Sequence, residues 1–178
     1  MKKFLAPVAV MIALFAGASA QAQTNLSLVG DLNMASFDVN GASSDKTLGV
    51  GGGALLEFQS SPSFGLEIGA LYNPRVQGDA VKFTANTLQL PVVLRFHLSN
   101  YVSLGVGGYY LSYMQNRNYG SKNDYGALGS LGIYIPVASG TRFVIDGRYI
   151  YGIKDQYAGA GENFSRDIQV LAGLRFSF

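Results

Sequence analysis

Apolar and polar residues alternate along most of this chain with a period of two. The C-terminal segment carries apolar side chains at Ile168, Val170, Ala172, Leu174, Phe176 and Phe178. The residues between them are polar or glycine, with Leu171 as the exception. Side chains on a β-strand point alternately to its two faces, so this period predicts a strand with one apolar and one mainly polar face. The chain is therefore expected to end inside a strand, whereas most chains end in polar, poorly ordered residues.

Seven earlier segments repeat the alternation. They span residues 25–37, 48–59, 64–73, 87–98, 101–113, 125–137 and 142–152. Short connections near Ser61, Ser99 and Ser139 alternate with longer polar ones, and both kinds are rich in turn-forming residues. No helical period of useful length and no Pro- or Ser-rich linker interrupts the series. The pattern predicts one all-β domain, an eight-stranded up-and-down antiparallel β-barrel with both termini at the same end.

The charged residues within these segments indicate which solvent the apolar face meets. Charges lie on the face opposite the apolar one at Asp31, Glu57, Glu67, Arg95, Asp146, Arg148 and Arg175. A soluble barrel would point its apolar side chains inward and need many charges outside. In an outer-membrane barrel the apolar face meets lipid, where a basic side chain at the midplane costs about 2–4 kcal/mol, and the polar face lines the lumen. Because the charges are few and of both signs, we expect a transmembrane barrel with these residues as a polar network in its lumen.

Pairing within that network follows from the strand directions. Arg95 is expected to pair with Glu67 on the neighbouring strand, with Glu57 in reach, and Asp146 and Arg148 to pair with each other. Further large side chains on inward positions are expected at Asn33, Gln89, Tyr109, Tyr134 and Gln169. Eight strands enclose a space that side chains can just fill, so the lumen is predicted to be closed.

Aromatic residues on the apolar face are expected to lie at two levels, one near each rim of the barrel. Phenylalanines fall near the rim that holds the termini at Phe58, Phe64, Phe96, Phe143, Phe176 and Phe178. Tyrosines fall near the opposite rim at Tyr72, Tyr110, Tyr149 and Tyr151. Two aromatic belts of this kind are typical of the two membrane–water interfaces.

The N-terminal residues have the layout of a secretory signal peptide. Lys2 and Lys3 precede an apolar stretch that ends at the small residues Ala18, Ser19 and Ala20. The alternative is an uncleaved anchor, for which the apolar stretch is short. We therefore assign residues 1–20 to the signal peptide and 21–178 to the barrel domain. Removal of the two lysines leaves 11 basic and 11 acidic side chains, which does not suggest a nucleic-acid partner.

Other residue types argue against catalysis. The chain has no cysteine, so disulfides and thiolate metal sites are excluded, and no metal or cofactor is expected. His97 is the one histidine and falls at the terminus-bearing end, so a Ser–His pair at the outer rim is not possible. We interpret it as a membrane-interface residue and expect no enzyme. The glycines of Gly49–Ala54 fit close strand approach better than a phosphate loop, and Pro91 predicts a bulge.

Together, the signal peptide, the eight alternating segments and the terminal Phe178 resemble small outer-membrane β-barrel proteins of Gram-negative bacteria. This group includes OmpA-type transmembrane domains, OmpX and the porin-family or PorT-like barrels. "TLQLPVVLRF" and "DGRYIYGIKD" also resemble recurrent strand phrases of PorT-like barrels. The resemblance implies that Phe176 and Phe178 form the signal read by the barrel assembly machinery. It also implies periplasmic chaperones as partners during biogenesis, and outer-membrane lipid and lipopolysaccharide as the surroundings.

Two functions remain open from the sequence. The first is a structural or surface-interaction barrel with a lumen filled by side chains, expected to act as a monomer. The second is a narrow channel with porin-like transport of small solutes. This architecture supports many functions, so the resemblance does not decide between them.

Overall fold

A computed structural model of the chain describes residues 23–39, 42–43, 47–77, 83–114, 123–153 and 163–178, and the predicted signal peptide lies outside these ranges. Within them, no helix has the length and apolar character needed to cross a membrane.

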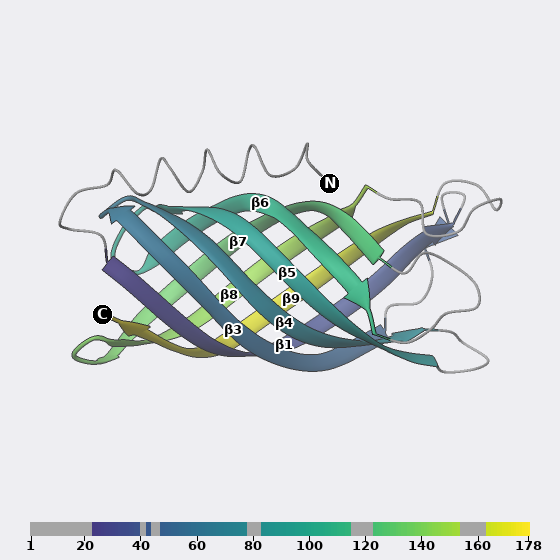
Figure 1. The fold of residues 1–178 in the computed structure, drawn as a ribbon, viewed down its shortest axis with the longest axis horizontal. Helices are drawn as coiled ribbons and strands as arrows, with labels where there is room; N and C mark the ends of the chain where they lie inside the picture. Colours follow the sequence, from purple (N-terminus) through teal and green to yellow (C-terminus); the bar gives the residue numbers. More distant parts are fainter. Residues whose placement is uncertain (1–22, 40–41, 44–46, 78–82, 115–122, 154–162) are drawn as a thin grey trace.

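The described strands close into a barrel. Eight long strands form its wall: β1 (Gln23–Val39), β3 (Thr47–Ser61), β4 (Phe64–Gln77), β5 (Phe83–His97), β6 (Val102–Tyr113), β7 (Asn123–Ala138), β8 (Thr141–Gly152) and β9 (Asn163–Ser177). Each pairs antiparallel with the next, and β1 pairs with β9 to complete the circle (Figure 1). The two-residue strand β2 (Ala42–Ser43) pairs only with the end of β1. The predicted eight-stranded up-and-down barrel is confirmed.

Several strands extend beyond their predicted limits. The apolar alternation predicted that the third segment ends at residue 73 and the fourth begins at residue 87, but β4 runs to Gln77 and β5 starts at Phe83. The ladder continues there through Val76 opposite Thr84 and Gln77 opposite Phe83. Backbone hydrogen bonds extend a hairpin whatever its side chains are, so hydrophobic alternation marks only the part of each strand that needs an apolar face.

The strand pairing at Pro91 differs from the prediction. Ile68 pairs with Val92 and Leu71 with Gln89, in one register, and the two positions between them are unpaired. On the other side, Pro91 still lies opposite Tyr109 of β6. The predicted bulge is therefore wrong, because no extra residue is inserted. Proline lacks an N–H group, and the ladder toward β4 is interrupted instead of shifted.

The outward face of the barrel is apolar over the middle of its strands. Large exposed side chains include Leu28, Val50, Leu104 and Ile133, each at least 42 % exposed. The expected tyrosines Tyr72, Tyr110, Tyr149 and Tyr151 also face outward, and so do Phe58, Phe96 and Phe178. An apolar wall of this extent requires lipid around it.

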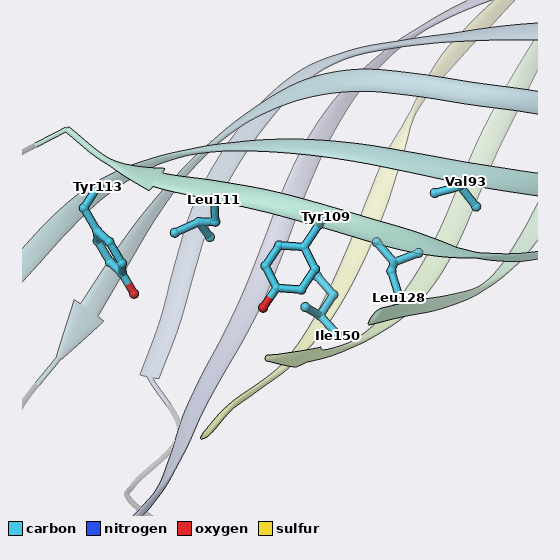
Figure 2. Close-up of a cluster of buried hydrophobic side chains, with 6 residues drawn as sticks. All are labelled: Val93, Tyr109, Leu111, Tyr113, Leu128 and Ile150. Atoms are coloured by element: carbon cyan, nitrogen blue, oxygen red, sulfur yellow. The ribbon is translucent and has the colours of Figure 1, made fainter. Parts of the chain in front are cut away.

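The interior contains more apolar side chains than the sequence suggested. Figure 2 shows one buried cluster that comes from β5, β6, β7 and β8: Val93, Tyr109, Leu111, Tyr113, Leu128 and Ile150. A second cluster comprises Val29, Leu55, Leu71, Tyr134, Val144 and Leu171. A side chain in a narrow, filled lumen touches other side chains and little water. Apolar residues are therefore as acceptable there as polar ones, provided that the polar ones find partners.

Candidate functional site in the barrel lumen

Four charged side chains meet in the middle of the lumen and form what we call the central cluster: Glu67, Arg95, Asp146 and Arg148. Arg95 Nε donates to Glu67 Oε2 at 3.0 Å, and its guanidinium also contacts Asp146. Arg148 Nη2 donates to Glu67 Oε1 at 2.7 Å and to Asp146 Oδ2 at 2.8 Å. Each arginine thus contacts both carboxylates, and the cluster joins β4 and β5 to β8 across the barrel.

Burial of the central cluster is nearly complete. The exposed fractions of the side chains are 1 % for Arg95, 5 % for Glu67, 2 % for Asp146 and 0 % for Arg148. Two positive and two negative charges balance one another. Ser130 accepts a further hydrogen bond from Arg95 Nη1 at 3.0 Å. Removing charges from water is costly unless they are paired and hydrogen-bonded. Every charge of the central cluster is paired, and among its polar side-chain atoms only Arg148 Nη1 lacks a hydrogen-bond partner.

A second ionic cluster lies nearer the end of the barrel where β1 begins and β9 ends. Arg175 Nη1 donates to Glu57 Oε2 at 2.8 Å, and His97 Nε2 lies 2.7 Å from Glu57 Oε1. The Arg175 guanidinium carbon lies 4.7 Å from the centre of the Tyr134 ring. Glu57 is therefore held by Arg175 and His97, and not by Arg95 as the sequence reading allowed.

His97 does not face the membrane. Its side chain is 7 % exposed, and its ring centre is 5.8 Å from that of Tyr134 inside the lumen. The interpretation as an interface residue is therefore wrong. The signal was available in the sequence, because His97 lies two positions after Arg95 and period-two alternation places both on the inward face.

Farther from the end where β1 begins, hydrogen bonds between amide, hydroxyl and carboxylate side chains connect the strands. Gln89 Oε1 accepts from Asn73 Nδ2 at 2.9 Å and from Gln169 Nε2 at 2.7 Å. Gln169 also donates to Asp31 Oδ2 at 3.4 Å, which connects Asp31 to this group of amide side chains. Toward the same end, Asp124 accepts from Ser165 at 2.7 Å and from Tyr109 at 3.0 Å. Asp124 was not identified from the sequence.

Beyond the second cluster, the lumen opens into a polar cavity of about 210 Å³. Its lining includes Asn25, His97, Arg142 and Arg175. Among the described residues, no group of three His, Cys, Asp or Glu side chains is placed to hold a metal ion. The described interior therefore offers ion pairs and amide hydrogen bonds, and these hold the strands together.

The last residues of the chain close the barrel seam. Phe176 lies opposite Leu26 of β1 and Thr141 of β8, and its side chain is partly buried. The backbone N–H of Phe178 donates to the Thr24 carbonyl at 2.9 Å, while its side chain is 77 % exposed. The terminal aromatic ring therefore points away from the core.

Comparison with known proteins identifies similar barrels. A family profile described as "Outer membrane protein beta-barrel domain" matches residues 6–176. The outer membrane protein OprG from Pseudomonas aeruginosa is 14 % identical, with a TM-score of 0.55 and coverage of 91 % of this chain and 98 % of that one. Curated proteins give no match.

Two further solved structures have the same fold. The outer membrane protein AlkL in lipid bilayers reaches a TM-score of 0.61 at 14 % identity, with 90 % of this chain and 93 % of that chain covered. Ail of Yersinia pestis, the attachment invasion locus protein in complex with a heparin analogue, reaches 0.52 at 16 % identity, with 88 % and 100 % covered. Identities this low establish a shared fold and nothing about shared ligands.

Proposed function

Because the chain belongs to the family of outer membrane protein β-barrel domains, we propose that it is a closed barrel with a structural or surface-interaction role. It resides in the outer membrane of a Gram-negative bacterium. Short turns face the periplasm in such barrels and longer connections face outward. The end that holds the C-terminus and the turn between β7 and β8 is therefore periplasmic (Figure 1).

The low exposure of the inward side chains is the observation that carries this proposal. Arg95, Arg148, Gln89 and Gln169 are each at most 2 % exposed. Side chains that line an open pore would be in contact with water, and these four side chains are almost completely shielded from it. The balanced charge of the central cluster also differs from the ring of one sign that a selective pore presents.

The neighbours favour an interaction role over catalysis. They are outer-membrane barrel proteins, and one of them, Ail, is an attachment invasion locus protein. The only histidine of this chain is held by Glu57 at the periplasmic side of the lumen, away from the outer rim. A closed barrel of this kind would act through its outer surface and its connections.

Conductance across a planar lipid bilayer tests the closed lumen. The folded wild-type protein should give no large, reproducible steps. Arg148→Ala removes the most deeply buried side chain of the central cluster and should raise conductance. Leu28→Ala, on the lipid-facing side, is the matched control and should not.

Large steps from the wild-type barrel would contradict the proposal. If Arg148→Glu shifted the ion selectivity of such steps, the ions would be passing the central cluster. Transport of small solutes through a narrow channel would then be the function.

A further inference from the structure

Two arginines lie directly opposite each other where β8 and β9 pair near the periplasmic end. Arg142 of β8 and Arg175 of β9 are partners in the antiparallel ladder, and both line the polar cavity inside the barrel. Directly opposite side chains of an antiparallel pair have Cβ atoms about 4.5–5.5 Å apart, and like charges in this position destabilise the pairing. The barrel therefore concentrates positive charge at one point of its inner wall.

The carboxylates of the described residues do not neutralise this charge. Arg175 forms a salt bridge with Glu57, and the other oxygen of Glu57 is held by His97. Arg142 forms no salt bridge with a carboxylate in the described part of the chain, and it donates to the Asn100 carbonyl at 3.1 Å. One positive charge is left over even when His97 is neutral.

Arg175 also has hydrogen-bonding capacity that the described residues do not use. Its side chain is 4 % exposed, and Nη1 donates to Glu57, but Nε has no partner there. The Tyr134 ring, 4.7 Å from the guanidinium carbon, restricts the orientation of the group. Because a buried donor without a partner is costly, an anion that completes the hydrogen bonding of this guanidinium would be favoured.

The cavity suits a small anion. The rest of its described lining consists of amide and hydroxyl side chains, one proline and His97, and it contains no Asp or Glu. Its volume of about 210 Å³ is many times what one water molecule requires, so a phosphate group has room in it. The second ionic cluster lies between this cavity and the deeper lumen, so a solute reaches the two arginines from the periplasmic end.

We propose that this cavity binds a phosphate group from the periplasm. Arg142 and Arg175 donate to different oxygens of it. A phosphate offers enough acceptors for two guanidinium groups, whereas the two oxygens of a carboxylate match a single one, so the paired arginines favour phosphate. The bound charge also offsets the repulsion between the two strands. The proposal rests on the proposed function only for the compartment that supplies the phosphate.

Calorimetric titration with inorganic phosphate tests the proposal. The refolded barrel is kept in a maltoside detergent, which carries no phosphate, at constant ionic strength. We expect saturable binding, and Arg142→Gln should weaken it about ten-fold or more, because one charge-assisted contact is lost. Arg166→Gln is the matched control: it removes the same charge from an exposed position near the other end of β9 and should bind like the wild type.

Nitrogen NMR of the arginine side chains gives a second measurement, which does not depend on the folding of a variant. In the wild type, phosphate should shift the Nε–H resonances of Arg142 and Arg175 and leave that of Arg166 unchanged. Glycerol phosphate then distinguishes two sources of the same chemistry. If it competes with inorganic phosphate, the site accepts phosphate monoesters, and if it does not compete, the site takes the free ion.

Three results would overturn the proposal. The first is the absence of saturable phosphate binding to the wild type, and the second is equal weakening by Arg142→Gln and Arg166→Gln. The third is acetate binding as tight as phosphate binding, because the cavity would then be a carboxylate site. Large conductance steps would contradict the closed lumen and leave these measurements unchanged, so the two proposals can fail separately.

Discussion

Arg95 and Glu67 form an ion pair that runs diagonally between adjacent strands inside the barrel. Arg95 lies directly opposite Gly65 in the β4–β5 ladder, and Glu67 lies opposite Val93, yet Arg95 Nε reaches Glu67 Oε2 at 3.0 Å. From this position the same guanidinium also reaches Asp146 on β8 and Ser130 on β7. One side chain therefore links four strands.

Truncating this arginine should destabilise the barrel strongly. Arg95→Ala leaves two buried carboxylates with one cation, and orphaning a buried charge typically costs about 3–5 kcal/mol. Arg142→Ala is the control, because Arg142 makes an exposed hydrogen bond to the Asn100 carbonyl at 3.1 Å and should cost less than about 1 kcal/mol. Urea unfolding in lipid vesicles measures both. Equal losses would show that the central cluster contributes little to stability.

Glycines on the two faces of the wall should respond oppositely to alanine. At Gly53, an added Cβ would collide with the Ala70 carbonyl oxygen and lie 2.9 Å from Leu71 Cα, both of them backbone atoms that cannot move without separating β3 from β4. Gly53→Ala should therefore lower the unfolding free energy. Gly129→Ala meets open space and should raise it by about 0.5–1 kcal/mol, as alanine does over glycine within a strand. The prediction is wrong if both variants shift stability in the same direction.

Replacing Pro91 should close the gap in the β4–β5 ladder. Pro91→Val supplies the missing N–H, and we expect this amide to be protected from hydrogen exchange like its neighbours. The free energy of unfolding should change little, because a hydrogen bond gains about 1 kcal/mol and loss of the proline ring costs about 0.4–1 kcal/mol through the unfolded chain. Rapid exchange at position 91 would mean that the strands are held apart there by something other than the proline.

Deleting Phe178 should reduce insertion into the outer membrane and leave the stability of the folded barrel nearly unchanged. The side chain is 77 % exposed, and its backbone contributes one hydrogen bond to Thr24, so the purified barrel should unfold at nearly the same urea concentration. In cells, the amount of heat-modifiable barrel in the outer membrane should fall severalfold if the assembly machinery reads this residue. Leu98→Ala, which removes another exposed apolar side chain at a strand end, is the control. Full insertion of the truncated protein would remove Phe178 from the proposed assembly signal.

The sequence alone determined the fold and the facing of most residues. Alternation with a period of two assigns each side chain to one of two faces. Charges on the polar face, such as Arg95 and Asp146, then require lipid on the other side. These inferences succeed because the sequence of a single strand is enough to show which face each side chain is on and which solvent that face meets. The error at His97 came from classifying it by its height and not by its alternation.

Only the tertiary structure decided which inward residues meet. Arg148 and Glu67 are 81 positions apart in the chain, and Arg175 and Glu57 are 118 apart. The first pair lies across the lumen and the second joins two strands that are separated by β1, so both depend on how the eight strands are staggered when the barrel closes. The alternation along one strand does not show which residues of another strand lie at the same level of the barrel. Those levels are set by the register between neighbouring strands and by the pairing of β9 with β1 that closes the barrel.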